Sequence, residues 1–136
     1  MEIKINKLQH IGVPVTNLQV SLAFYRELGF EQVTGSPFNH HGKTGNMAMM
    51  KHDQIIMELY QLPGDDLEEI RTRKDGHVDH VALDVSDIDG TFSELKKASF
   101  QIIEEQPVFL PFWEKGCKYF NILGPDGERL EFNQIL

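Results

Sequence analysis

The sequence predicts an α+β fold made of two tandem βαβββ modules, because its second half repeats its first. Residues 8–15, which contain His10, return seventy positions later as residues 78–85, which contain His80. Both stretches alternate between branched apolar residues and other residues, as half-buried strands do. A helical pattern follows each stretch, so strand and helix recur together.

A second stretch repeats near the end of each half. Residues 53–62 return as residues 126–135, and Glu58 falls on Glu131. A carboxylate within an apolar strand needs solvent, a partner or a metal ion, because an uncompensated buried charge is costly. The same alignment pairs Gln61 with Gln134. We expect one domain over residues 1–136, with repeats at about 5–62 and 77–136 and a linker at 63–76.

Composition narrows the function classes. A chain of 136 residues is one domain's worth of core. Its 21 acidic and 13 basic residues give a net charge of −8, which disfavours nucleic acid and anionic membranes as partners. Cys117 is the single cysteine, and no stretch approaches the roughly 20 apolar residues of a membrane span or resembles a signal peptide. We therefore expect a cytoplasmic protein.

The first module begins with the strand at residues 8–15. The spacing of Thr16 and Gln19 is typical of a capping box, and Gly29 is suited to end the helix that follows. The expected elements are a helix over residues 17–28, a strand at 30–33, a polar loop at 34–46, and strands at 47–51 and 55–60.

The second module repeats this plan after a charged linker, in which we expect a short helix around residues 67–73. Ser86 is the expected N-cap of its helix. The expected elements are a strand at 78–85, a helix at 87–98, a strand at 100–104, a loop at 105–116, a strand at 118–123, a turn at 124–127 and a strand at 129–133.

Strand alternation predicts a metal site. The apolar neighbours of each His and Glu would pack on a helix, so the His and Glu would project from the opposite face of the sheet. Two imidazoles and two carboxylates suit one divalent cation per site, namely Ni, Co, Zn, Mn or Fe. A single His on a strand is more often structural, so the repeat carries this prediction. The expected ligands are His10, Glu58, His80 and Glu131.

Other residues are weaker candidates. Tyr60, Asn133 and Arg129 share the alternation of the glutamates and are expected to contact substrate. Trp113 is also expected to bind substrate, as part of a lid, and a place in the core or in an interface is an equal alternative. His40, His41 and His52 lack support from the repeat and are expected to be solvated loop residues, with contact to substrate as the alternative for His40 or His41.

The chain resembles the glyoxalase, bleomycin-resistance and extradiol-dioxygenase superfamily, known as the vicinal oxygen chelate proteins. The resemblance lies in His-Ile-Gly-Val at 10–13, Phe24-Tyr25 with Leu28-Gly29-Phe30, His-Val-Ala-Leu at 80–83 and Gly-Pro-Asp-Gly-Glu-Arg-Leu-Glu-Phe at 124–132. It implies a cupped mixed sheet around a metal, helices outside, the four ligands named above, and a homodimer.

Within this superfamily the His-Glu-His-Glu pattern is most similar to glyoxalase I, the lactoylglutathione lyase. The resemblance implies a metal-dependent lyase or isomerase that acts on a small carbonyl substrate, an α-hydroxycarbonyl or hemithioacetal-like molecule, through an enediolate. Glu131 is the first choice of catalytic base and Glu58 the second.

Three alternatives stay open. Glyoxalase I enzymes typically carry Arg where Pro14 stands, so the use of glutathione is not fixed. Methylmalonyl-CoA epimerase-like members more often carry Gln where Glu58 stands, yet an epimerase or another metal-dependent relative fits the other ligands. A drug-binding resistance protein without catalysis is the third alternative. A separate question is how many chains build one site, because sites could form within one chain or across a dimer.

Overall fold

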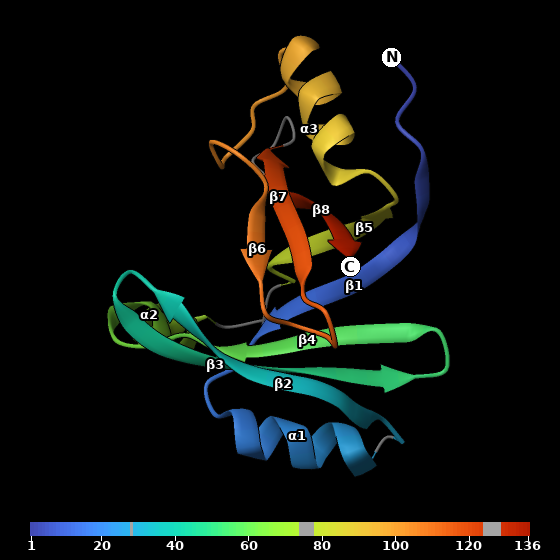
Figure 1. Cartoon of the computed structure of the whole chain (residues 1–136). Coiled ribbons are helices and arrows are strands. Elements are labelled where there is room, and N and C mark those ends of the chain that lie inside the picture. The colour runs from blue at the N-terminus through green and yellow to red at the C-terminus, as the bar shows by residue number, and fades with distance from the viewer. Residues whose placement is uncertain (28, 74–77, 124–128) are drawn as a thin grey trace. The chain divides into compact units, whose positions relative to one another are not determined.

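The computed structural model describes residues 1–27, 29–73, 78–123 and 129–136. The elements follow the order strand, helix and three strands twice, with a further helix between the two sets (Figure 1). The fold is therefore α+β with two βαβββ modules, as predicted. The expected end of the first helix at Leu28, the end of the linker at Gly76 and the turn at 124–127 lie outside the described residues.

The chain divides into two compact units. The first unit is His10–Asp79, and the second unit combines Met1–Gln9 with His80–Leu136. Strand β1 (Ile5–Pro14) contributes to both, because its residues up to Gln9 belong to the second unit. In that unit, Asn6 Nδ2 donates a hydrogen bond to Asp84 Oδ2 at 2.9 Å.

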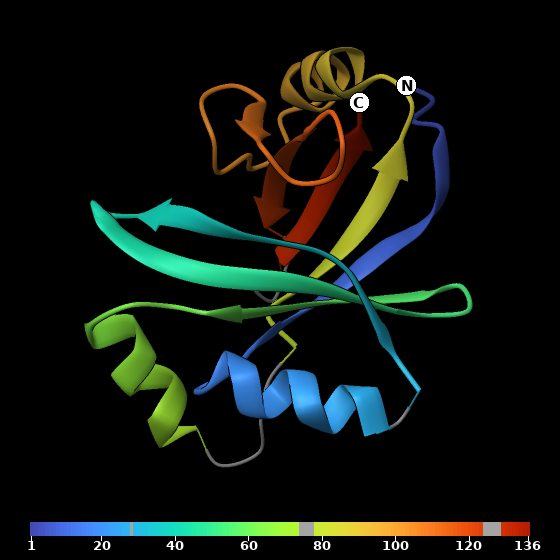
Figure 2. The ribbon, with the colours of Figure 1, turned by 60° about the horizontal axis from the view of Figure 1, so that its bottom comes forward.

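In the first unit the strand order is β2-β3-β4-β1, with β1 and β4 parallel and the other neighbours antiparallel. Helix α1 lies along one face of β2, β3 and β4 (Figure 2). Leu18 and Leu22 of this helix are buried against Ala48, Met50 and Leu59 of the strands. The elements are α1 (Leu18–Glu27), β2 (Glu31–His40), β3 (Lys43–His52), β4 (Ile55–Gln61) and α2 (Asp65–Thr72).

In the second unit the strand order is β5-β8-β7-β6, again with one parallel pair, β5 and β8. Helix α3 packs on β7 and β8. Phe120, which is fully buried, stacks on Phe132 and meets Phe92 of α3 edge to face. The elements are β5 (His80–Val85), α3 (Ile88–Lys97), β6 (Val108–Leu110), β7 (Cys117–Leu123) and β8 (Arg129–Ile135).

Two equivalent glutamines tie each helix to the strand that carries the glutamate. Gln61 Oε1 accepts a hydrogen bond from the backbone N of Leu18 at 2.8 Å, and Gln134 Oε1 accepts one from Ile88 N at 3.0 Å. Both bonds satisfy a backbone N–H of the first helical turn, which has no partner within the helix. The sequence alignment of these glutamines thus has a structural basis.

The helix caps lie one residue later than predicted. Asn17 Oδ1 accepts from the backbone N of Gln19 and of Val20 at the start of α1, in place of the expected Thr16 cap. Asp87, not Ser86, caps α3 by accepting from Gly90 N at 2.9 Å. Asn and Asp are strong N-cap residues, so adjacent candidates compete for this position.

Three predicted elements were wrong. The polar loop at 34–46 is a β-hairpin, in which β2 and β3 pair from Glu31–Lys51 to His40–Lys43. The strand at 100–104 is reduced to one isolated bridge, Ile102 to Ile122. The loop at 105–116 contains the short strand β6.

The linker does contain a helix, α2, as expected. Arg73 at its end bonds Glu69 through two nitrogens, and this hydrogen bonding raises the pKa of the guanidinium. Among the described residues, no helix is long and apolar enough to cross a membrane.

Candidate functional site

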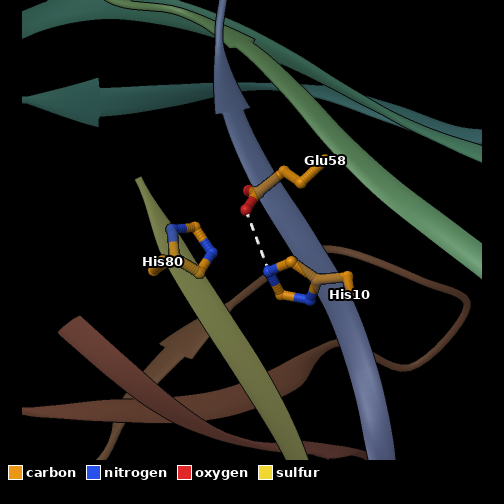
Figure 3. A group of neighbouring side chains, drawn as sticks. All are labelled: His10, Glu58 and His80. Atoms are coloured by element: carbon orange, nitrogen blue, oxygen red, sulfur yellow. Dashed lines mark ion pairs between the residues drawn. The ribbon is translucent and has the colours of Figure 1, made fainter. Parts of the chain in front are cut away.

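The first unit contains a His–Glu pair on neighbouring parallel strands, with His10 buried and Glu58 partly buried. Gly12 of β1 lies opposite Glu58 of β4, so His10, two residues before Gly12, shares the face of Glu58. His10 Nε2 lies 3.1 Å from Glu58 Oε2 (Figure 3). The side chains are 2% and 13% exposed, so neither is a solvated surface group.

The second unit repeats this arrangement in the same register. Ala82 of β5 lies opposite Glu131 of β8, and His80 is again two residues before the small residue. His80 Nε2 lies 3.3 Å from Glu131 Oε2, and both side chains are buried. The sequence repeat therefore corresponds to a repeated side-chain geometry.

The apolar neighbours behave as the strand alternation predicted. In the first unit Val13, Met57 and Leu59 pack with α1 in the core. Leu83 and Leu130, with Phe132, do the same with α3 in the second unit. Each His–Glu pair consequently lies on the face of its strands that points away from the helix.

Within each pair, the His nitrogen and the Glu oxygen are spaced as two ligands of one metal ion are. Two ligand atoms that are each about 2.1 Å from one ion lie about 3.0 Å apart at right angles and about 3.4 Å apart at tetrahedral angles. The two N–O separations, 3.1 and 3.3 Å, fall in this interval. Imidazole nitrogen and carboxylate oxygen are ligands of Zn, Ni, Co, Mn and Fe. The His nitrogen and the Glu oxygen of each pair could therefore occupy two coordination positions of such an ion.

Asn133 holds the glutamate of the second unit. Its Nδ2 donates to Glu131 Oε1 at 2.7 Å, in a contact where both groups are buried. The carboxylate fixes the orientation of the amide, because only the nitrogen can donate to it. The bond leaves Oε2 as the oxygen near His80. Asn133 Oδ1 is buried and has no hydrogen-bond partner within the part of the chain that the structure describes.

Asn121 is a residue that the sequence reasoning missed. It lies opposite Glu131 in the β7–β8 register and is buried. Its Nδ2 donates to Glu104 Oε1 at 2.8 Å. Its Oδ1, like that of Asn133, is a buried acceptor without a hydrogen-bond partner in the described ranges. The alternation of Phe120 and Ile122 with Asn121 could have indicated this face, but Asn121 has no polar counterpart in the first module.

The other predicted substrate contacts differ in their burial and in their place in the fold. Tyr60 is buried on β4 opposite Pro14, two residues after Glu58. Arg129 is exposed at the first position of β8. Trp113 lies between β6 and β7, partly buried, with a left-handed φ of 69°. Its Nε1 is buried, and no described residue accepts from it.

Comparison with known proteins gives matches over nearly the whole chain. The sequence family model of the Glyoxalase/Bleomycin resistance protein/Dioxygenase superfamily matches residues 7–132 of this chain. A curated relative, the uncharacterized protein YwbC of Bacillus subtilis (strain 168), is 30% identical over 132 residues. That alignment covers 94% of this chain and 97% of the relative.

Solved structures share the fold. The hypothetical protein BH1468 from Bacillus halodurans C-125 matches with a TM-score of 0.76 and 22% identity, over 98% of this chain and 96% of that one. Methylmalonyl-CoA epimerase from Mycobacterium tuberculosis matches with a TM-score of 0.78 and 16% identity, over 97% and 89%. At these identities the similarity is one of fold.

Proposed function

The chain belongs to the Glyoxalase/Bleomycin resistance protein/Dioxygenase superfamily, and on this premise we propose that it is a divalent-metal-dependent lyase or isomerase of the glyoxalase I type. Its substrate would be a small α-hydroxycarbonyl or hemithioacetal-like molecule. The observation that carries the proposal is the pair of His–Glu contacts in identical register, one in each module.

We propose that the two pairs converge on one metal centre with His10, Glu58, His80 and Glu131 as ligands. Their two carboxylates would neutralise the charge of a divalent ion, and their two imidazoles would favour an ion of borderline softness. Because each chain supplies both pairs, a homodimer would hold two such centres.

The chemistry needs an electrophile and a base. A divalent ion at this position would act as a Lewis acid that polarises the substrate carbonyl and acidifies the neighbouring C–H bond. Glu131, when it is not bound to the ion, would take that proton, hold it while the substrate passes through an enediolate, and return it to the adjacent carbon. Glu58, the equivalent residue of the other module, is the second candidate for the base.

Asn133 would set the position of this base. Its hydrogen bond to Glu131 Oε1 limits rotation of the carboxyl group. It also stabilises the ionised form of the carboxylate, as donors to a carboxylate do. Asn133 acts in this scheme through Glu131 and is therefore a positioning residue.

The acceptors of Asn121 and Asn133 favour a substrate that carries hydrogen-bond donors. Each Oδ1 is buried and has no partner among the described residues, and such a group is costly to leave unpaired. A substrate hydroxyl or amide N–H would satisfy them. Substrates with a hydroxyl beside the carbonyl should therefore react better than their deoxy analogues.

An epimerase is the second candidate, and the fold similarity to methylmalonyl-CoA epimerase favours it. It would use the same proton abstraction, with return of the proton to the other face of the same carbon. The two reactions differ in which carbon receives the proton, so product analysis separates them.

The test follows proton transfer by NMR in D₂O with metal-loaded protein. Hemithioacetals made from methylglyoxal and several thiols, among them glutathione, are compared with methylmalonyl-CoA. The lyase proposal expects conversion of a hemithioacetal to a thioester. Glu131→Gln should lower kcat by about a hundredfold or more, the contribution of a general base.

The matched control is Glu94→Gln, which changes an exposed carboxylate on α3 and should leave kcat unaltered. Deuterium exchange in methylmalonyl-CoA, without conversion of any hemithioacetal to a thioester, would contradict the lyase and favour the epimerase. Absence of turnover and exchange with every substrate, in protein that carries metal, would contradict both.

A further inference from the structure

The first unit holds a second group of metal-ligand side chains, formed by residues other than His10 and Glu58. His40 and His41 stand at the tip of the β2–β3 hairpin, and Asp66 stands in the first turn of α2 (Figure 1). One ligand atom from each of the three residues lies within 4.8 Å of the other two. Residues 26 positions apart in sequence thus meet at one place on the surface.

The hairpin turn brings His40 and His41 together at its tip. His41 and Gly42 both have positive φ, 49° and 78°, as the central residues of a type I′ turn do. Asn39 Oδ1 accepts a hydrogen bond from Gly42 N at 2.9 Å and closes the turn. Asn, Asp or Gly is the usual residue at the place of His41. The imidazole rings of His40 and His41 lie with their centroids 4.5 Å apart.

The carboxylate already contacts one of these rings. Asp66 Oδ2 lies 2.6 Å from His40 Nε2. An exposed pair of this kind contributes little to stability by itself, because water screens it. Two imidazoles and one carboxylate, however, form the ligand set of many divalent metal sites. The pair would open by about 0.4 to 0.8 Å to share an ion, and both side chains are accessible enough to do so.

We propose that His40, His41 and Asp66 bind a divalent transition-metal ion of borderline softness, such as Zn²⁺, with water in the remaining positions. The site is accessible from solvent, so an ion enters it without any opening of the fold. The bound ion connects the hairpin tip to the start of α2. It therefore slows hydrogen exchange in α2 and in the hairpin turn.

This site is tested by titrating Zn²⁺ into ¹⁵N-labelled full-length protein and following the backbone amides and histidine ring nitrogens by NMR. Zinc should shift the ring nitrogens of His40 and His41 and the amides of the hairpin turn. We expect zinc affinity to fall at least about tenfold in each of His40→Asn, His41→Asn and Asp66→Asn. Loss of a residue that only orients a metal ligand already lowers affinity by about this factor. His41→Asn retains the turn, because Asn adopts positive φ readily.

The matched control is Asp65→Asn, which removes the neighbouring carboxylate in the same helical turn and should leave affinity unaltered. If Asp65→Asn and Asp66→Asn lowered zinc affinity equally, zinc would be attracted by the overall negative charge of the helix end and not by a defined site. That result would overturn the proposal. Unshifted His40 and His41 rings at zinc well in excess of protein would also overturn it. The rings of His10 and His80 report separately on ions bound there.

Discussion

Ala82 lies directly opposite Glu131 across the β5–β8 pair, and it is fully buried. Gly12 takes the equivalent place opposite Glu58 in the other module. A small residue at this position leaves the shared face open, so that the histidine two residues earlier reaches the glutamate. Both modules therefore combine a His, a small residue and a Glu in one register.

Ala82→Leu should disrupt the second His–Glu pair. The larger side chain would occupy the space beside Glu131 and separate it from His80, at a cost of about 1 to 3 kcal/mol in the free energy of unfolding. Urea unfolding measures this cost, and elemental analysis measures the loss of metal. The matched control, Ala98→Leu, changes an exposed residue after α3 and should alter neither quantity appreciably. Full metal content in Ala82→Leu would show that the small residue is not needed.

Asn133→Leu should lower metal affinity by about 10 to 100 fold, the usual effect of removing a group that orients a ligand. The substitution removes the donor to Glu131 Oε1 and also the unsatisfied Oδ1 of Asn133. Loss of the donor to Glu131 Oε1 lowers the free energy of unfolding and loss of the unpaired Asn133 Oδ1 raises it, so these two effects on stability oppose each other, whereas metal affinity only falls. Competition with a chromophoric chelator measures the affinity. Asn133→Asp should be worse than Asn133→Leu, because it places a second carboxylate beside Glu131, and the reverse order would contradict the positioning role.

Removal of metal should destabilise the protein. An ion that binds only the folded state adds about 2.7 kcal/mol to the free energy of unfolding at a concentration of 100 times Kd. Scanning calorimetry of chelator-treated and metal-loaded protein should therefore show a lower Tm without metal. Asp66→Asn serves as the background, so that the surface site does not contribute. In that background Glu58→Gln should lose most of the difference, and a full metal effect on its Tm would exclude Glu58 as a ligand.

The sequence was sufficient to predict the features that recur in both modules. His10 with His80, Glu58 with Glu131 and Gln61 with Gln134 each stand out because they occupy matching places. Strand alternation then gave the correct face for each His and Glu, since the neighbouring apolar residues do pack on the helices.

The β2–β3 hairpin could not be recognised in this way. Its first strand contains Gly35, Ser36 and Pro37, which favour turns. Pairing with the buried strand β3 overrides these preferences, and Pro37 is tolerated because β2 is an edge strand of its unit. The ring of Phe38 covers Gly45, where a Cβ would lie 2.5 Å from it. A larger residue at position 45 would therefore force the ring of Phe38 to move.

The predicted strand at 100–104 fails for a different reason. Glu104 Oε2 accepts from the backbone N of Asn121 at 2.6 Å, so a side chain takes the place of a strand neighbour. Such a replacement leaves no pattern in the sequence. The group of His40, His41 and Asp66 is equally unpredictable, because it depends on a hairpin that the composition does not indicate.

The proposed function requires that the two repeated His–Glu pairs hold one divalent ion. The most direct measurement is the metal content per chain of Asp66→Asn, Asp66→Asn/Glu58→Gln and Asp66→Asn/Glu131→Gln, each loaded in turn with Ni, Co, Zn, Mn and Fe and freed of excess ion. The account predicts about one ion per chain in Asp66→Asn and a marked loss in both double variants. Absence of metal in Asp66→Asn with every ion, or full retention in either double variant, would contradict it.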